Sequence, residues 1–343
     1  MNQVYIEDLK KQYERINFEK FNNKNILITG SGGLICSYLI DLLIYANLYK
    51  NANIKIYASE LKEEYLKERF SYYYDNELFI PVIQNVCNEF KINDKIDIII
   101  HGASNANPSL YISDPVGTMN ANYMGCKNLL ELAKENNSKF LYLSSGDVYG
   151  ETSLELINES DYGYFDILTE RSSYASSKRA SETLCYAYNK QYNIDTYIVR
   201  PAHIYGSTFT KSDSRAISDF IRCVINDNDI IMKSDGSSVR SYCYVGDTVV
   251  GMMMILDKGT SGNAYNISNT DSIISIKESA EYLAKLCNKK VIIDIPETEL
   301  NKKINSNTKV IKLNNEKLKS LGWNTVYNIE MGLETTIKIL KDK

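Results

Sequence analysis

The segment LSSGDVYG, residues 143–150, carries hydroxyl and carboxylate side chains where a hydrophobic strand is expected to end. Ser144 and Ser145 are followed by Gly146 and Asp147. Buried parallel strands that finish in polar or flexible residues are typical of a sheet edge at which a ligand binds. Hydroxyl and carboxylate groups at such an edge can hydrogen-bond a substrate or transfer a proton.

A tyrosine followed four residues later by a lysine is a second arrangement suited to chemistry. A phenol with an ordinary pKa near ~10 must lose its proton to act as a base at neutral pH, and a nearby ammonium group favours the phenolate. A spacing of four places both side chains on one face of a helix. With 27 tyrosines in the chain, this spacing alone is weak evidence. It occurs at Tyr123/Lys127, Tyr174/Lys178 and Tyr186/Lys190.

A glycine-rich turn, TGSGGLIC at residues 29–36, directly follows the apolar run NILIT at residues 25–29. Glycine permits a tight turn and lets the backbone approach a pyrophosphate at the N-terminus of the next helix. The position of the turn between the first expected strand and the first expected helix indicates dinucleotide binding.

This turn resembles the TGxxGxxG fingerprint of extended short-chain dehydrogenases/reductases. Thr29, Gly30 and Gly33 match the fingerprint, and Cys36 stands in place of the third glycine. The resemblance implies a Rossmann fold and an NAD cofactor, with Glu60 on the adenosine ribose favouring NAD over NADP. The cofactor-binding residues it implies are Gly30, Gly33, Leu34, Ile35, Glu60, Asn85, Val86, Ala103, Ser104, Asn122, Tyr174, Lys178, Pro201 and His203.

The same resemblance selects one of the three tyrosine–lysine pairs. Tyr174 opens a helix after the loop ERSS and stands 29 residues after Ser145, a separation typical of the family's serine and tyrosine. The family strand ends S-[ST]-x-x-VYG, which aligns Ser145 with the hydroxyl that contacts the reacting oxygen. The implied catalytic residues are Ser145, Asp147, Tyr174 and Lys178.

Further segments resemble nucleotide-sugar-modifying members, with UDP-glucuronate decarboxylase (UDP-xylose synthase) as the most similar pattern. They include VRPAHIYG, DSRAISDFI and DGSSVRSYCYVGD. The resemblance implies that Arg215 and Arg240 bind the substrate diphosphate, for which a guanidinium fork is suited. A structural salt bridge is the alternative for each arginine. The implied substrate-binding residues are Ser145, Gly146, Asp147, His203, Arg215 and Arg240.

The implied reaction begins with oxidation of a sugar C4 hydroxyl to a 4-keto intermediate. Sugar 4,6-dehydratases carry Asp-Glu where this chain has Gly146–Asp147, so the acid for dehydration is absent from its usual place. The pattern therefore favours a decarboxylase. A 4-epimerase, a 4,6-dehydratase and a simple C4 dehydrogenase remain alternatives, and Asp147 could instead cap a turn.

Apolar β-branched runs alternate with helical patterns through the first half of the chain, which predicts an α/β fold with a doubly wound parallel sheet. We expect an N-terminal helix in residues 1–23, an NAD-binding domain in 24–206 and a mainly substrate-binding lobe in 207–343. Expected strands are 25–29, 54–58, 78–83, 96–100, 139–143 and 196–199, and expected helices are 34–49, 60–74, 117–136 and 175–192.

The composition limits which binding partners and which cellular compartment are expected. A net charge of −4 without a basic cluster argues against nucleic acid or membrane partners. The sequence contains no run of 18 apolar residues, so no membrane-spanning helix is expected. Residues 1–23 lack the apolar core of a signal peptide. Seven scattered cysteines without CxxC suit a reducing cytoplasm, and two histidines make a metal site improbable. The family resemblance also implies a homodimer.

Overall fold

A parallel sheet forms the centre of the computed structural model, which describes residues 1–169, 171–295 and 312–342. Within these ranges seven strands pair in the order β10-β6-β5-β4-β1-β2-β3, and every pairing is parallel. The predicted doubly wound α/β fold is confirmed. The strands are β1 (Asn25–Thr29), β2 (Lys55–Glu60), β3 (Phe79–Ile83), β4 (Ile98–His101), β5 (Lys139–Leu143), β6 (Thr196–Pro201) and β10 (Asn263–Ile267).

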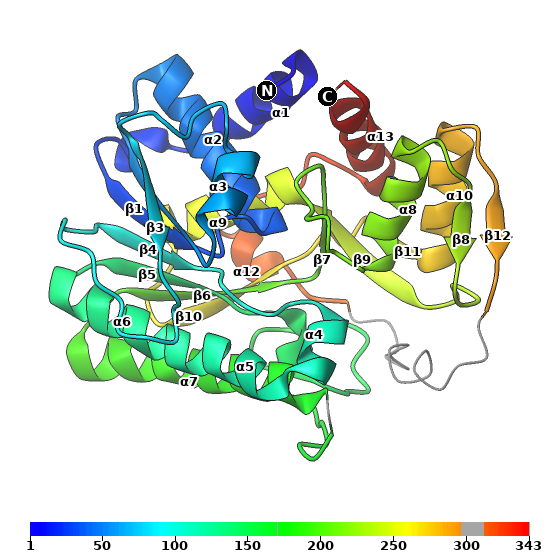
Figure 1. The fold of residues 1–343 in the computed structure, drawn as a ribbon. Coiled ribbons are helices and arrows are strands. Elements are labelled where there is room, and N and C mark those ends of the chain that lie inside the picture. The colour runs from blue at the N-terminus through cyan, green and yellow to red at the C-terminus, as the bar shows by residue number, and fades with distance from the viewer. Residues whose placement is uncertain (170, 296–311, 343) are drawn as a thin grey trace.

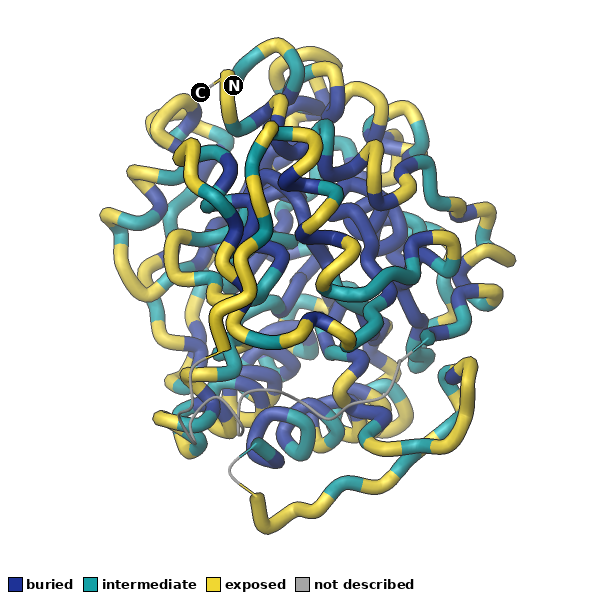
Figure 2. Tube along the Cα trace, turned by 90° about the vertical axis from the view of Figure 1, so that its right-hand side faces the viewer, coloured by how far each residue is buried: buried dark blue, intermediate teal, exposed yellow. Residues whose placement is uncertain are grey.

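Both faces of this sheet are covered by helices, which explains why its strands are apolar without alternation. Along β1, Ile26 and Ile28 pack on the side of α1 (Gln3–Tyr13), α2 (Leu34–Lys50) and α9 (Val245–Lys258). Leu27 packs on the opposite side, against α6 (Gly125–Asn136) and α7 (Ser172–Tyr192). Figure 1 shows these two layers above and below the sheet, and Figure 2 shows the buried residues gathered between them.

A smaller lobe is built on two further sheets with the strand orders β11-β9-β7 and β12-β8. The chain then returns to the central sheet, because β10 pairs with β6. The elements of this lobe are β7 (His203–Tyr205), α8 (Ala216–Ile225), β8 (Ile230–Met232), β9 (Val239–Tyr244), β11 (Ile273–Ser275), α10 (Ile276–Leu286), β12 (Val291–Ile293) and α13 (Ile329–Lys341).

Short helices complete the described chain. The helix expected over residues 60–74 is only α3, because Glu60 pairs with Ile83 and so extends β2. In the segment before α6, the backbone widens into one π-helical turn, a feature that often occurs at functional sites. The short elements are η1 (Phe18–Lys20), α3 (Glu63–Arg69), α4 (Pro108–Ser113), α5 (Pro115–Met119), the π-helical η2 (Asn120–Met124), η3 (Gly146–Tyr149) and α12 (Glu316–Lys319).

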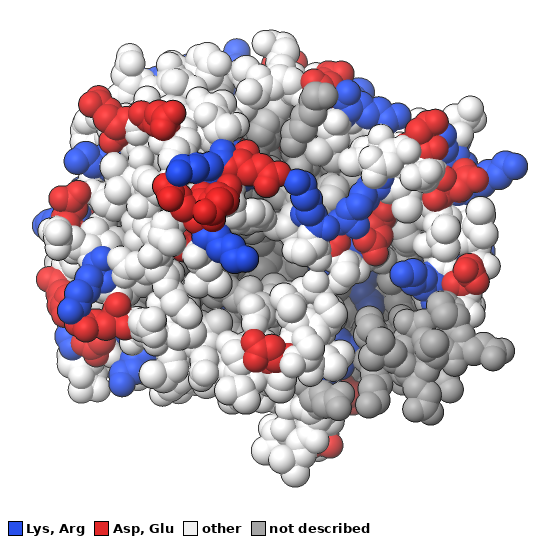
Figure 3. Space-filling view, in the orientation of Figure 1, with Lys and Arg blue, Asp and Glu red and all other residues white. Residues whose placement is uncertain are grey.

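The surface carries mixed charge. On the face shown in Figure 3, basic and acidic side chains are interspersed rather than separated into large areas of one sign. None of the helices in the described part of the chain is long and apolar enough to span a membrane.

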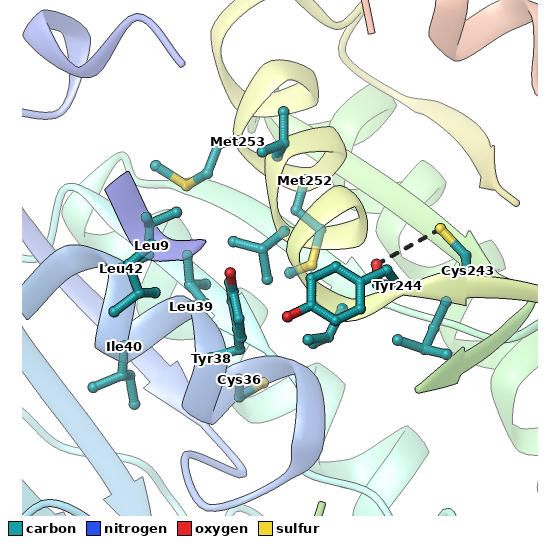
Figure 4. Packing of buried hydrophobic residues seen from close by; sticks show 14 of the residues in the cluster. Leu9, Cys36, Tyr38, Leu39, Ile40, Leu42, Cys243, Tyr244, Met252 and Met253 are labelled. Atoms are coloured by element: carbon teal, nitrogen blue, oxygen red, sulfur yellow. Dashed lines mark hydrogen bonds between the residues drawn. The ribbon is translucent and has the colours of Figure 1, made fainter. Parts of the chain in front are cut away.

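The N-terminal helix α1 is joined to the rest of the protein by a buried carboxylate. Asp8 accepts hydrogen bonds from the hydroxyls of Tyr38 at 2.6 Å, and of Tyr244 and Tyr327 at 2.7 Å each. These three tyrosines come from α2, from β9 and from the segment before α13. Figure 4 shows the apolar side of the same contact, where Leu9 lies beside α2 and α9.

Asp8→Asn should lower the free energy of unfolding by roughly 2–4 kcal/mol, because the amide cannot accept from three hydroxyls as a carboxylate does. Urea unfolding followed by circular dichroism measures the change. Glu7→Gln, an exposed neighbour on the same helix, is the matched control and should leave the midpoint unchanged. Equal midpoints for both variants would show that the tyrosine cluster does not hold α1 in place.

Candidate active site

The carboxyl ends of β1 and β4 meet at the point where the strand order reverses, the usual ligand position in such sheets. The turn after β1 begins with Gly30, whose φ of +67° is a left-handed conformation that favours glycine. A Cβ on Gly30 would lie 2.8 Å from the backbone of Ala103, which follows β4. Two chain segments therefore approach each other closely over the edge where the sequence predicts a dinucleotide.

Cys36 occupies the space beside this turn where the fingerprint has glycine. Its thiol is buried, and a Cβ added to Gly102 would lie 2.3 Å from the Cys36 Sγ. The larger residue on α2 is thus accommodated because the facing residue after β4 has no side chain. The helix and the strand therefore still pack closely, because the larger side chain of Cys36 is matched by the missing side chain of Gly102.

Polar groups around the turn fit NAD. Glu60 is the last residue of β2, two residues beyond the expected end of the strand. Its Oε1 accepts a hydrogen bond from the Gly32 amide at 2.9 Å, which fixes the carboxylate beside the glycine-rich turn. Among the described residues, Ser104 Oγ and Asn122 Oδ1 are buried without a hydrogen-bond partner. Buried polar atoms normally have a partner, so these two favour a polar ligand at this edge.

The remaining cofactor candidates surround the same strand ends. Leu34 and Ile35 begin α2, and the Leu34 carbonyl accepts from the Thr208 hydroxyl at 2.7 Å. Gly33 is the N-cap residue of that helix. Asn85 and Val86 follow β3, Asn122 lies in the π-helical turn, and Pro201 ends β6.

Ser145, Tyr174 and Lys178 come together at the carboxyl end of β5. Ser145 caps η3, and its hydroxyl accepts from the Asp147 amide at 3.1 Å. Tyr174 lies in the first turn of α7, and a hydrogen bond with Ser145 favours its phenolate. Burial nevertheless raises the pKa of Tyr174 above its ordinary value, and the nearby Asp147 carboxylate raises it further.

Lys178 lies beneath this group as a buried ammonium. Its Nζ donates to the Leu143 carbonyl at 2.7 Å and lies 4.8 Å from the ring centroid of Tyr142 and 5.7 Å from that of Tyr174. Burial lowers the pKa of Lys178 to about 8. The lysine therefore carries its charge at neutral pH and loses it in mildly alkaline solution.

Position 146 lacks an acidic side chain and is closely packed. Gly146 is buried, and a Cβ there would lie 3.3 Å from Leu313 Cδ1 and 3.4 Å from the Pro201 carbonyl oxygen. A side chain at this position would therefore begin in contact with an apolar side chain and a carbonyl oxygen. Asp147, in contrast, is open to solvent, yet surrounding protein raises the pKa of its carboxyl, and Arg171 and Arg240 oppose that rise.

The smaller lobe contributes cationic and imidazole groups. His203 begins β7, where burial together with the charges of Arg240 and Arg215 lowers its pKa to about 3, so its ring is neutral at pH 7. Arg215 is bound to Asp213 through Nε at 2.9 Å and Nη2 at 2.6 Å, and to the Ile204 carbonyl through Nη1 at 2.8 Å. The structural salt bridge that the sequence left open is therefore present at Arg215.

Two residues of this site were not singled out from the sequence. Tyr111 of α4 stacks on Tyr174 with ring centroids 5.1 Å apart and an interplanar angle of 23°. Arg171 precedes α7 and hydrogen-bonds Tyr111, whose pKa burial raises to about 12. The arginine stands three residues before Tyr174, within the loop ERSS, and this closeness to the predicted base was the signal available in the sequence.

Fold and site together define a short-chain dehydrogenase/reductase of the extended class. Residues 26–268 match the NAD dependent epimerase/dehydratase family. The chain belongs to this family and is an NAD-dependent enzyme. In the described residues no group of three or more His, Cys, Asp or Glu side chains is arranged to hold a metal ion.

Relatives and a solved structure agree with this assignment. UDP-glucuronic acid decarboxylase 5 of Arabidopsis thaliana is 30% identical over 276 residues, covering 80% of this chain and 78% of the relative. UDP-glucuronic acid decarboxylase 1 of Danio rerio is 28% identical over 319 residues, covering 92% and 72%. UDP-glucuronic acid 4-epimerase from Bacillus cereus, solved with UDP-glucuronic acid and NAD, superposes with a TM-score of 0.77 at 22% identity, covering 93% of this chain and 99% of that one.

Gly102→Ala should destabilise the protein by roughly 1–3 kcal/mol, because the added methyl group overpacks against Cys36. Adding Cys36→Ala to that variant removes the thiol and should restore most of the loss. Thermal unfolding of the single and double variants measures both effects. A double variant as unstable as Gly102→Ala alone would disprove the exchange of volume between these positions.

Proposed function

We propose that the protein decarboxylates a nucleotide-diphosphate-linked uronate, such as UDP-glucuronate, through a 4-keto intermediate. The arrangement of Ser145, Tyr174 and Lys178 beside a single carboxylate, Asp147, carries this proposal. The two decarboxylase relatives, which align over most of the chain, support the substrate class.

Tyr174 takes the proton of the C4 hydroxyl, and Ser145 donates a hydrogen bond to the same oxygen. Lys178 favours the phenolate of Tyr174 through its charge. NAD, when bound, supplies the oxidising power that turns the C4 alcohol into a ketone and later reverses that step. Because burial raises the pKa of Tyr174 in the protein alone, the base depends on positive charge close to it.

Decarboxylation follows from the chemistry of the intermediate. A ketone at C4 makes the C5 carboxylate a β-keto acid, so the bond between C5 and the carboxyl carbon breaks with loss of CO₂ and leaves an enolate. A proton must then be added at C5, and Asp147 is the acid that we assign to this step. Desolvation by the surrounding protein raises the pKa of this carboxyl above its ordinary value, which favours the protonated form that the step needs.

Positive charge at the reacting end favours an acidic sugar. Arg171 lies on the turn before Tyr174, and its charge acts on both Asp147 and Tyr111. We assign Arg171 to the C5 carboxylate and Arg240 to the diphosphate. Arg215, already bound to Asp213, contributes its charge and fixes the backbone beside His203.

A 4-epimerase is the second candidate, because the Ser145–Tyr174–Lys178 group would serve C4 oxidation and reduction without help from Asp147. Dehydration is disfavoured, since Gly146 offers no acid and packs against Leu313. A simple C4 dehydrogenase would release NADH in proportion to product.

Tyr174→Phe should lower kcat by about a hundredfold to ten-thousandfold, because the substitution removes the base. Tyr186→Phe is the matched control, since Tyr186 lies on the same helix and also has a lysine, Lys190, four residues later. Products of UDP-glucuronate and UDP-glucose are identified by mass and proton NMR. Loss of CO₂ supports decarboxylation, whereas unchanged mass, loss of water or stoichiometric NADH release would support epimerase, dehydratase or dehydrogenase instead.

We also propose that the protein works as a homodimer in the cytoplasm. Large apolar side chains are exposed along α5, η2 and α7, namely Val116, Met119, Tyr123 and Tyr186. These elements pack against one another, so the side chains form a face suited to a second copy of the chain. The seven free cysteines support a reducing compartment.

A Met119→Lys/Tyr123→Glu double variant should convert a dimer into a monomer, because charges would be buried in the interface. Light scattering coupled to gel filtration measures the molar mass. Leu48→Lys, at an exposed apolar position on α2, is the control and should remain dimeric. A wild-type protein that is monomeric at micromolar concentration would refute the dimer.

A further inference from the structure

A buried ion pair between α7 and β6 lies directly behind the candidate active site. Glu182 follows Lys178 by one helical turn on α7, and only 8% of its surface is exposed. Arg200 of β6 is 2% exposed and binds Glu182 through Nε at 3.0 Å and Nη2 at 2.6 Å. The parallel fork geometry makes this a strong, directional contact.

This ion pair is bonded to both ends of the segment that carries Ser145 and Asp147. On one side, the Ser144 hydroxyl donates to Glu182 Oε1 at 2.6 Å. On the other side, Arg200 Nη1 donates to the Tyr149 hydroxyl at 2.9 Å. The two bonds therefore enclose the short stretch between Ser144 and Tyr149.

The second end is fixed further by the central sheet. The Tyr149 hydroxyl donates to Asn266 Oδ1 of β10 at 2.5 Å, and Arg200 Nη1 also donates to the Glu159 carbonyl at 2.8 Å. Three elements that are distant in sequence, α7, β6 and β10, thus converge on this one turn. Every side chain in the network is buried and has a partner.

A gain in folding stability does not by itself explain why this protein has a buried ion pair. Removing two charges from water is costly, and replacing a buried ion pair by apolar residues is often neutral or stabilising. Accurate placement of catalytic groups explains the pair better, because a displacement of about 1 Å in a catalytic group can lower the rate about a hundredfold. The negative charge of Glu182 also lies close enough to act on Lys178.

We propose that Glu182 and Arg200 are positioning residues, which hold the Ser145–Asp147 turn against Tyr174, and that Glu182 places its negative charge one helical turn from Lys178. The positional part stands on the contacts alone, whereas the effect on turnover rests on the proposed function. Glu182 favours the ammonium form of Lys178, against the burial that lowers its pKa to about 8. Loss of the Glu182 charge would therefore deprotonate Lys178 at lower pH.

The test combines hydrogen exchange with kinetics. Ser144→Ala removes the bond to Glu182, Tyr149→Phe removes the bonds to Arg200 and Asn266, and Glu182→Gln removes the charge. The control is Asp41→Asn on α2, which likewise removes a buried carboxylate paired with an arginine, Arg69, on the opposite side of the sheet. Amide exchange in the peptide covering residues 143–150 is followed by mass spectrometry, without substrate or turnover.

Exchange in that peptide should rise at least about threefold in the first three variants and stay at the wild-type rate in Asp41→Asn. In kinetics, Ser144→Ala and Tyr149→Phe should lower kcat about tenfold with little change in KM. Only Glu182→Gln should move the alkaline fall of activity to lower pH, by about one unit. Ser144→Ala keeps the charge and should leave that fall near pH 8.

Equal exchange rates in wild type, Ser144→Ala and Tyr149→Phe would overturn the positioning role, whether or not the protein acts on a sugar. An unshifted alkaline fall in Glu182→Gln would overturn the electrostatic role. If the wild type turns over no nucleotide sugar, the proposed function fails, while the exchange result still decides the positional claim.

Discussion

An ammonium group buried at the end of a parallel sheet is the constraint around which this protein is organised. Lys178 is removed from water, so every group near it has to compensate for lost hydration. A backbone carbonyl of β5, the face of Tyr142 and the charge of Glu182 do so together. The first two partners are neighbouring residues of β5 and the third lies on α7 itself, so the charge is held where one strand and one helix pack together.

The two lobes contribute different kinds of groups to the candidate active site. The sheet contributes groups whose positions are fixed by strand pairing, such as Ser145 and the turn at Gly30. The smaller lobe contributes the neutral ring of His203 and the guanidinium of Arg240, whose charge acts on Asp147. Figure 3 shows this face of the molecule hollowed between the two parts.

Much of this arrangement could be predicted from local sequence. The strands at residues 25–29 and 139–143 were predicted with the bounds that the structure has, because runs rich in apolar and aromatic residues end there and are followed by glycine or serine. The extent of β2 through Glu60 was missed, since its last pairing depends on the distant β3. A salt bridge of Arg215 could be stated only as an alternative, because the sequence does not show which way the side chains of Asp213 and Arg215, two residues apart, are oriented.

The residues whose roles were not predicted contact partners that are distant in sequence, and their roles depend on those contacts. Nothing in the sequence distinguishes Tyr111 from the other tyrosines, of which the chain has 27 in all, and only the structure shows its ring stacked on Tyr174. Glu182 and Arg200 are 18 residues apart and lie on a helix and a strand, so neither carries a local motif. The spacing of Tyr174 and Lys178, in contrast, is a property of one helix and was accessible from the sequence.

Gly146 finally bears on how reactions in this family can diverge. A carboxylate side chain at that position would begin 3.3 Å from Leu313 Cδ1 and 3.4 Å from the Pro201 carbonyl oxygen, so the end of the Leu313 side chain would have to shift by a few tenths of an ångström. Leu313 lies more than 160 residues away in sequence. The residue at position 313 therefore affects how readily position 146 accepts an acid.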